Sequence, residues 1–531
     1  MATFPLPGVK HGRRIAVSVI EQRAQEPDSP WASVPIDNND LSKGFKDLSY
    51  YQLNNAANHA ARWLSQHLPA TSEPFQCFAY AGPKDIRFPI LEIAAAKLQK
   101  VIVVPSPLTT AEAQLHIFEK KKCTVYLRPA CMADAVDAIL RTAPHITAIE
   151  VPELDAFMQE AEAFPYVYEK SWDDGKDDPW IVFHTSGTTG HPKAITYTHS
   201  MLATIDTAAS LPDLEYWHIH QYAQRRWYTA FPSLHCLGTI MNLIIPTYLH
   251  TIAIIGPPSL PTRETTTQIL QSSNATGATL TPSGLNDLVT SPDSLQTLRN
   301  LTYIQNAGAP LPKATGDQLS PYTTLASCIG STESGLYCTA LRPDSTDWSY
   351  ISFQSHAGAH LEPRPDNLHE LVFIRDPACA LQPIFSVYPN LTRFETNDLW
   401  TEHPTRKGLW KIVGRADDYV YLAHADGIHA SSIEPDFEAH PAVKAALIGG
   451  HGRPAPVLLL ELRPNQDESA IRAELAPYIE TVNKRVSDCV ALSNDRILFT
   501  KKDKPFIRTI KGSISRLVTL RSYEEEIDQL F

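Results

Sequence analysis

Residues 180–193, WIVFHTSGTTGHPK, decide the fold that we expect for this chain. The first four residues are apolar and predict a short buried strand. The small residues that follow predict a loop whose backbone N–H groups approach a ligand closely. A row of such N–H groups suits phosphate oxygens, and Lys193 adds a positive charge. We therefore expect a strand followed by a phosphate-binding loop, with a polar surface turn as the alternative.

Strand and helix patterns alternate on both sides of this stretch. Apolar residues recur every three or four positions along residues 50–66, which predicts an amphipathic helix. A helix at 90–97 between strands at 78–80 and 101–104 is typical of a parallel α/β sheet. Further strands of this sheet-forming part are expected at 228–231, 251–255, 278–281 and 303–306.

The pattern of apolar and polar residues changes towards the C-terminus. Shorter β-like runs begin near residue 345, and a smaller α+β pattern follows Gly414. At 531 residues the chain is too long to fold around a single hydrophobic core of ordinary size, so at least two domains are expected. We place the domain boundary near Asp417, so that residues 1–416 form an N-terminal core and residues 417–531 form a C-terminal domain of ordinary size.

The composition is that of a globular protein, with 43% hydrophobic and 20% charged residues. A net charge of −12 without a basic block argues against a nucleic-acid partner. The eight cysteines form no CxxC pair, which favours reduced thiols over disulfides or a zinc site. The first residues contain no apolar signal segment, and polar residues interrupt the apolar stretch 238–256. We therefore expect a cytoplasmic protein with no membrane partner.

The order of small residues in the loop resembles that of a known family. The loop lacks the pattern GxxxxGK[ST], and TSGTTGxPK resembles the adenylate-forming enzymes. These include acyl-CoA and aryl-CoA ligases, luciferases and adenylation domains of nonribosomal peptide synthetases. Further matches follow in family order: NAGAPL at 306–311, GSTESG at 330–335, FETNDL at 394–399, GRADD at 414–418 and IRTIKGS at 507–513. The resemblance implies a large N-terminal domain of stacked α/β sheets with a small β-barrel-like subdomain, then a small mobile α+β domain.

The resemblance also implies which residues bind ATP. The loop residues that would hold its phosphates are Thr185, Ser186, Gly187, Thr188, Thr189, Gly190 and Lys193. The adenine would lie beside Gly308, Ala309 and Pro310. Asp398 would accept both ribose hydroxyls, with Arg415 in contact with the ribose as well.

Two more residues receive roles from the same resemblance. Lys511 would be the catalytic lysine that bridges the substrate carboxylate and the α-phosphate. A solvated basic patch with Lys501, Lys502 and Lys504 is the alternative for that lysine. Asp417 would be the hinge about which the C-terminal domain rotates between two half-reactions.

The segment GSTESG carries the expected metal contact. In the family motif that it resembles, Ser331 lies beside the nucleotide, Thr332 contacts phosphate and Glu333 helps to hold Mg²⁺. A hard cation favours carboxylate oxygen and bridges phosphate oxygens, so this chemistry needs such a side chain. A helix N-cap followed by a glutamate near the helix dipole is a second interpretation, and both can hold together. Ile329 stands where the family usually has a tyrosine that stacks on adenine.

The segment FPSLHCLG at 231–238 aligns with a family segment at the acid pocket. Amino-acid-activating relatives place an aspartate near His235 to pair with the α-ammonium group of the substrate. No acidic residue is present here, so we expect an aryl, keto or other acid without that amine. Gly308 and Gly330 would line the same pocket. An ordinary packed histidine is the alternative for His235.

The expected reaction is the ATP- and Mg²⁺-dependent activation of a carboxylic acid, followed by transfer to a thiol. Several segments most resemble adenylation domains of fungal NRPS-like carboxylic acid reductases, in which the acceptor is the phosphopantetheine of a carrier domain in the same polypeptide. A stand-alone CoA ligase is one alternative. The residues 423–429 depart from the family loop that serves thiol transfer, and with Ile329 they leave a nucleotide-binding pseudoenzyme as another.

Overall fold

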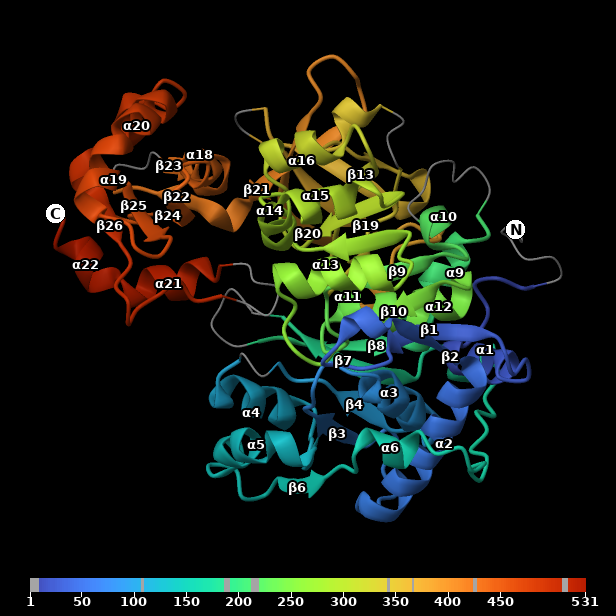
Figure 1. Ribbon diagram of the computed structural model, residues 1–531. Helices are drawn as coiled ribbons and strands as arrows, with labels where there is room; N and C mark the ends of the chain where they lie inside the picture. Colours follow the sequence, from blue (N-terminus) through green and yellow to red (C-terminus); the bar gives the residue numbers. More distant parts are fainter. Residues whose placement is uncertain are drawn as a thin grey trace. The chain divides into compact units, whose positions relative to one another are not determined.

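The strand predicted ahead of the phosphate loop is β7 (Pro179–His184), and it lies in a six-stranded sheet (Figure 1). A computed structural model describes residues 9–106, 109–185, 192–211, 219–340, 344–364, 367–423, 427–508 and 514–531. The chain divides into two compact units. The first is Met1–Gly358 with Ile374–Arg393, and the second is Ala359–Phe373 with Phe394–Phe531. The expected domain boundary at Asp417 stays a prediction.

The six-stranded sheet has the order β6-β5-β3-β4-β7-β8. Neighbouring strands pair in parallel, except that β8 runs antiparallel to β7. Its other strands are β3 (Cys77–Tyr80), β4 (Val101–Val103), β5 (Val125–Arg128), β6 (Thr147–Glu150) and β8 (Ala194–Thr198). The predicted helices are confirmed as α2 (Tyr50–His67) and α3 (Arg87–Lys97). Every residue of α3 is buried, which an apolar helix between strands requires.

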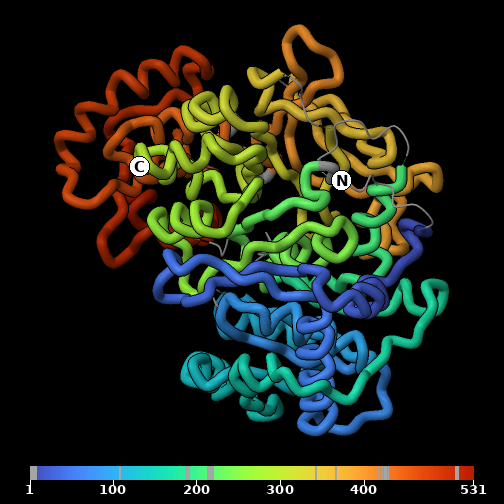
Figure 2. The backbone as a smooth tube through the Cα atoms, turned by 45° about the vertical axis from the view of Figure 1, so that its right-hand side comes forward, coloured from blue at the N-terminus to red at the C-terminus, as the bar shows by residue number. Residues whose placement is uncertain are grey.

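A second sheet of the first unit has seven strands in the order β13-β12-β11-β9-β10-β1-β2. These strands are β1 (Pro30–Pro35), β2 (Phe45–Ser49), β9 (Arg226–Thr229), β10 (Ile252–Ile254), β11 (Gly277–Leu280), β12 (Tyr303–Ala307) and β13 (Thr324–Cys328). The pairing is parallel from β13 to β1, and β2 closes the edge antiparallel. Figure 2 shows the N-terminal strands, in blue, alongside the green part of the chain. The predicted α/β fold is therefore present in both sheets.

The apolar stretch 238–256 forms a helical run and then a strand, as the sequence predicts. The run consists of α11 (Cys236–Thr239), a π-helical turn η3 (Ile240–Ile244) and α12 (Ile245–Leu249). Pro246 has no N–H, so the carbonyl of Asn242 lacks its usual helical donor. The indole N–H of Trp31 donates to that carbonyl instead, at 3.0 Å. Among the described residues, no helix combines the length and the hydropathy that a membrane span requires.

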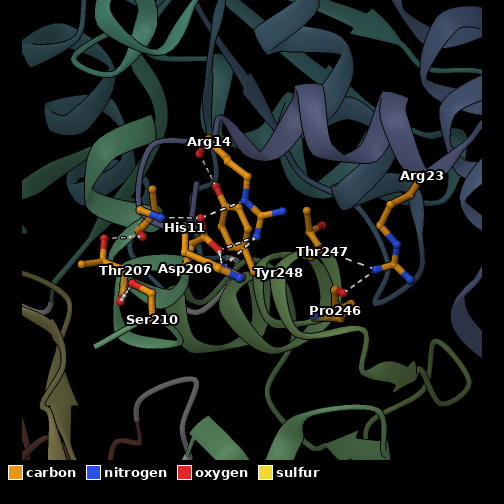
Figure 3. Close-up of polar contacts among 11 residues, drawn as sticks. His11, Arg14, Arg23, Asp206, Thr207, Ser210, Pro246, Thr247 and Tyr248 are labelled. Atoms are coloured by element: carbon orange, nitrogen blue, oxygen red, sulfur yellow. Dashed lines mark hydrogen bonds and ion pairs between the residues drawn. The ribbon is translucent and has the colours of Figure 1, made fainter. Parts of the chain in front are cut away.

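Asp206 binds the N-terminal segment, residues 11–14, to the rest of the first unit (Figure 3). This carboxylate lies in α9 (Thr204–Ala208) and is completely buried. It accepts hydrogen bonds from His11 Nδ1 at 2.7 Å, from the Gly12 N–H at 2.6 Å and from Arg14 Nε at 3.0 Å. The hydroxyl of Tyr248 donates to the Arg14 carbonyl at 2.9 Å. Because a buried carboxylate needs such partners, this cluster gives the N-terminal segment a defined position.

The second unit contains a small β subdomain and an α+β part. The subdomain is a four-stranded sheet of β18 (Ala359–Pro363), β19 (His369–Ile374), β20 (Arg393–Glu402) and β21 (Trp410–Arg415). The α+β part is built on β24 (Val443–Gly449), β25 (Val457–Leu462) and β26 (Ile497–Phe499). Its helices are α18 (Glu434–Glu438), α19 (Glu468–Glu474), α20 (Ala476–Asn483), α21 (Arg516–Ser522) and α22 (Glu524–Asp528). A separate apolar core that includes Phe437 and Leu460 holds this part together.

Candidate active site

The predicted phosphate loop is held at its base by two strands. β7 and β8 pair antiparallel up to His184 and Ala194. The next hydrogen bond runs from the Thr185 N–H to the Lys193 carbonyl at 3.1 Å. Lys193 is exposed, and no acidic side chain among the described residues pairs with it. Ser186, Gly187, Thr188, Thr189 and Gly190 lie outside the described residues, so their phosphate contacts stay predictions.

His184 connects the end of β7 to the segment that follows β4. Its Nε2 accepts a hydrogen bond from the Ser106 N–H at 2.9 Å. Burial lowers the pKa of His184 to about 4, so the ring is neutral at physiological pH. A neutral ring keeps the ring nitrogen free to accept this bond. The residue that opens the predicted loop is therefore a structural anchor.

The segment GSTESG forms a β-hairpin, and the helix N-cap interpretation is wrong. β14 (Gly330–Ser331) pairs antiparallel with β15 (Gly335–Leu336). The Ser331 hydroxyl accepts a hydrogen bond from the Ser334 N–H at 3.1 Å, which closes the turn. A Cβ on Gly330 would meet the Gly335 carbonyl oxygen at 2.2 Å. The glycines therefore select a tight hairpin, where a capping pattern alone predicted a helix.

Thr332, in the turn of this hairpin, is the point at which three motifs meet. The hydroxyl of Tyr197, on β8, donates to the Thr332 carbonyl at 2.8 Å. The thiol of Cys236 lies 3.6 Å from the Thr332 hydroxyl. These contacts join the strand after the phosphate loop, the GSTESG hairpin and the acid-pocket segment, which we define as residues 231–238. Tyr197 was not predicted as a site residue, because its place in an alternating strand pattern does not indicate this contact.

Glu333 follows Thr332 and has the properties expected of a cation ligand. It is half-buried, and no Lys, Arg or His among the described residues lies within ion-pair distance. The pKa of Tyr388 is raised mainly by its burial and secondly by the negative charge of Glu333. Among the described residues, no three His, Cys, Asp or Glu side chains cluster into a metal site of their own. One carboxylate beside a hydroxyl fits Mg²⁺, which takes few protein ligands and completes its shell with phosphate and water.

A hydrogen bond and close packing hold the acid-pocket segment at His235, the N-cap residue of α11. The Leu237 N–H donates to His235 Nδ1 at 3.1 Å, so the neutral ring carries its proton on Nε2. A Cβ on Gly238 would lie 1.9 Å from the Pro232 carbonyl oxygen, which leaves room for glycine alone. His235 thus acts as a packed helix cap, as the alternative interpretation expected. Its contact with substrate stays a prediction.

The proposed adenine-side residues lie at the carboxyl end of a parallel strand. β12 ends at Ala307, and Gly308, Ala309 and Pro310 follow it as exposed residues. Gly308 has a φ of 96°, a conformation that favours glycine. The carboxyl ends of strands in open α/β sheets are where ligands usually bind. The placement agrees with the predicted role, although the contact itself is untested.

The predicted ribose pair is formed within the second unit. Asp398 and Arg415 face each other in the β20–β21 register, and Arg415 Nη1 lies 3.3 Å from Asp398 Oδ1. Asn397 has a φ of 59°, in the left-handed region that asparagine adopts more readily than most other residues except glycine. The asparagine is therefore compatible with the turn that precedes Asp398. The backbone of Asp417 lies in the 3-10 turn η6 (Ala416–Asp418), and Lys511 lies outside the described residues.

These features define an enzyme class that binds a nucleotide and activates a carboxylate. A family model described as AMP-binding enzyme matches residues 21–363, and one described as AMP-binding enzyme C-terminal domain matches residues 417–531. The chain therefore belongs to the family of AMP-binding, adenylate-forming enzymes. The expected fold class is confirmed.

Curated relatives of this chain are longer proteins. The isocyanide synthase-NRPS hybrid crmA of Aspergillus fumigatus is 28% identical over 98% of this chain and 34% of its own length. The carboxylic acid reductase of Neurospora crassa is 28% identical over 98% of this chain and 51% of its own length. The chain thus spans between about one third and one half of these relatives. The predicted resemblance to NRPS-like reductases is confirmed as a distant homology.

Solved structures share the fold at low identity. The anthranilate CoA ligase AuaEII in complex with anthranoyl-AMP has a TM-score of 0.74 and 17% identity, covering 97% of this chain and 98% of that one. ATP-bound MatB from Rhodopseudomonas palustris has a TM-score of 0.72 and 16% identity, covering 97% of this chain and all of that one. These likenesses extend over both units and establish the architecture.

Proposed function

We propose that this chain converts a carboxylic acid without a free α-amine into an acyl-adenylate and then passes the acyl group to a phosphopantetheine thiol. A carboxylate oxygen attacks the α-phosphorus of ATP, the bond to the bridging oxygen breaks, and pyrophosphate leaves. The thiol sulfur then attacks the acyl carbon, loses its proton and expels AMP. The observation that carries the proposal is the meeting of three motifs at Thr332.

In this proposal the residues of the first unit bind the phosphates. Two anions must approach each other, so catalysis consists mainly of positioning and charge stabilisation. Lys193, the hydroxyl of Thr185 and the N–H groups of residues 186–190 hold the β- and γ-phosphates. Glu333 and Thr332 would hold Mg²⁺, which would neutralise charge on the phosphates. Gly308, Ala309 and Pro310 border the adenine, and Ser331 lies beside the nucleotide.

The residues of the second unit complete the proposed chemistry. Asp398 and Arg415 bind the ribose, and their observed pairing keeps the carboxylate oriented. Lys511 bridges the substrate carboxylate and the α-phosphate during adenylation. Asp417 is the hinge of a conformational change that removes Lys511 and admits the thiol.

The choice of acid follows from the acid-pocket segment. A substrate ammonium group needs a carboxylate partner when it is taken out of water. Residues 231–238 contain no Asp or Glu that could be this partner. His235, Gly308 and Gly330 then border an acid whose α-position carries no amine. Aryl and keto acids meet that description.

The choice of acceptor follows from the relatives. The carboxylic acid reductase and the NRPS hybrid extend well beyond the part that this chain matches. A carrier domain is therefore the acceptor that we favour, and free CoA is the alternative that the ligase-like fold leaves open. The eight free cysteines agree with the reducing environment of the cytoplasm. The acceptors are distinguished by supplying ATP, acid and either CoA or a phosphopantetheinylated carrier, and by detecting the thioester by mass spectrometry. Thioester on the carrier alone supports the proposal, and thioester on CoA alone overturns it.

The role of Lys511 is tested by adenylation itself. Lys511→Ala should lower the rate of acid-dependent pyrophosphate release by about two to three orders of magnitude, the scale of one lost electrostatic contact. Lys502→Ala is the matched control, because Lys502 is exposed in the same basic stretch. Equal rates in the two variants would assign Lys511 to a solvated basic patch.

A further inference from the structure

Glu92 is a buried acid that none of the motifs includes. It lies in α3, is completely inaccessible to solvent, and has no charged partner among the described residues. Its backbone carbonyl accepts a hydrogen bond from the indole N–H of Trp180 at 2.7 Å. Trp180 lies on β7, the strand that leads to the phosphate loop. The backbone of Glu92 is thereby fixed to the strand that leads to the phosphate loop.

The side chain of Glu92 reaches a second motif through Thr239. Glu92 Oε1 lies 3.0 Å from the hydroxyl oxygen of Thr239, and the same hydroxyl lies 2.7 Å from the carbonyl oxygen of Ser233. Ser233 belongs to the acid-pocket segment, and Thr239 is the last residue of α11. The chain of contacts therefore runs from the phosphate-loop strand through Glu92 to the acid-pocket segment.

The hydrogens in this chain of contacts can be assigned. A hydroxyl has one hydrogen to donate, and a carbonyl oxygen only accepts. If Thr239 donates to the Ser233 carbonyl, its shorter contact, then Glu92 must carry a proton and donate it to Thr239. Glu92 Oε2 is buried with no hydrogen-bond partner among the described residues, which a charged carboxylate would not tolerate. Burial raises the pKa of Glu92 to about 8, in agreement with this assignment.

We propose that Glu92, in its protonated form, is a positioning residue that fixes the acid-pocket segment relative to the phosphate-loop strand. The proposal rests on the proposed function in that residues 231–238 border the substrate acid. When Glu92 loses its proton it can only accept, so the Thr239 hydroxyl turns towards it. The Ser233 carbonyl then loses its donor, and the segment loses the contact that orders it.

Other titratable groups near Glu92 are distinguished from it by their partners or by substitution. On α3, Arg87 pairs with Asp85 at 2.7 Å. His199 stacks on Trp180, and burial lowers its pKa to about 3, so it stays neutral. In the acid-pocket segment, the His235 ring already accepts from the Leu237 N–H. Cys236 lies in the same segment, and Cys236→Ala would remove its thiol. Lys84 lines a pocket with Ser233, and burial lowers its pKa to about 8, so Lys84→Met separates any effect of its charge from that of Glu92.

The proposal predicts an alkaline loss of acid binding. Below about pH 8 the Michaelis constant for the acid should be constant. Above that pH, kcat/KM for the acid should fall about tenfold per pH unit, as for one essential protonated group. Glu92→Gln should keep nearly normal kcat/KM at pH 7 and lose the alkaline decline, because its amide donates to Thr239 at every pH. Glu92→Met, which cannot donate, should show a raised Michaelis constant for the acid at every pH.

Two outcomes would overturn the proposal. The first is an unchanged alkaline decline in Glu92→Gln, and the second is equal losses in Glu92→Gln and Glu92→Met when both are folded by circular dichroism. If Glu92→Gln does not fold, Thr239→Ser, which keeps the hydroxyl, and Thr239→Val, which removes it, make the same comparison.

A measurement without turnover separates this proposal from the proposed function. Infrared difference spectra of the folded chain between pH 7 and pH 9.5 should show the loss of a protonated carboxylic-acid band in the wild type and not in Glu92→Gln. If this band is present while no acid is activated, the proton assignment holds and the proposed function fails. If the band is missing from the wild type at pH 7, the Glu92 proposal fails by itself.

Discussion

Arg516→Met should destabilise the second unit, because it leaves a buried carboxylate without its cation. Arg516 is the first residue of α21, and it donates to both oxygens of Glu434, at 2.7 Å and 2.5 Å. The two side chains are only 14% and 10% exposed. Arg516 also donates to Asp418, next to the proposed hinge, at 3.2 Å, and to the Ile448 carbonyl at 3.1 Å. The arginine therefore joins three separate segments of this unit.

The magnitude follows from the burial of Glu434. Burial raises the pKa of this carboxyl even with Arg516 in place. Removing one partner of a buried ion pair costs about 3–5 kcal/mol of unfolding free energy. For a unit of this size that loss lowers the melting temperature by roughly 10 °C. Since Glu434 in the variant gains its proton more readily, the deficit should shrink as the pH falls from 8 towards 5.

The assay is differential scanning calorimetry of the full chain. Arg453→Met is the matched control, because Arg453 and its partner Asp528 are 30% and 53% exposed, and such surface pairs contribute about 1 kcal/mol at most. A double variant with Arg516→Met and Glu434→Leu should recover most of the loss, since the buried carboxylate of Glu434 is gone and the carboxylate of Asp418 is 25% exposed to water. A loss in Arg516→Met no larger than that in Arg453→Met would refute the reasoning.

Two further predictions concern the proposed ATP site. Glu333→Gln should lower acid-dependent pyrophosphate release by about 10²–10³-fold, because it removes the only charged cation ligand that we assign, and excess Mg²⁺ should restore part of the rate. Unchanged activity at limiting Mg²⁺ would remove Glu333 from the site. Asp398→Ala should raise the Michaelis constant for ATP by about ten- to a hundredfold through the loss of charged hydrogen bonds, with little change in that for the acid. An unchanged Michaelis constant for ATP in this variant would contradict the assignment of Asp398 to the ribose.

The sequence predicted the large sheets because their strands are continuous apolar runs with helices between them. β7 and α2 illustrate this, since burial on both faces leaves a continuous apolar run and burial along one stripe leaves a helical period. β14 and β15 have two residues each, so they are too short to show a periodic pattern of apolar residues. The Ser-Thr-Glu pattern between them then resembled a helix start, and only the paired backbone of the hairpin excludes it.

The contacts at the candidate site could not be predicted from local sequence. Thr332 meets Tyr197 and Cys236, which lie 135 and 96 positions away along the chain. Such pairings depend on how the sheets pack, and no periodic pattern records them. Glu92 did leave a signal, because it is the one acid within the apolar run ILEIAAA. A lone carboxyl in an apolar helix indicates a buried and protonated group.

The central claim is that this chain adenylates a carboxylic acid, and acid-dependent pyrophosphate release tests it most directly. The purified chain is incubated with ATP, Mg²⁺ and a panel of aryl, keto, aliphatic and α-amino acids. We expect release with at least one acid that lacks an α-amine, and none with the amino acids. Tight ATP binding with no pyrophosphate release for any acid would contradict the claim and leave a nucleotide-binding pseudoenzyme.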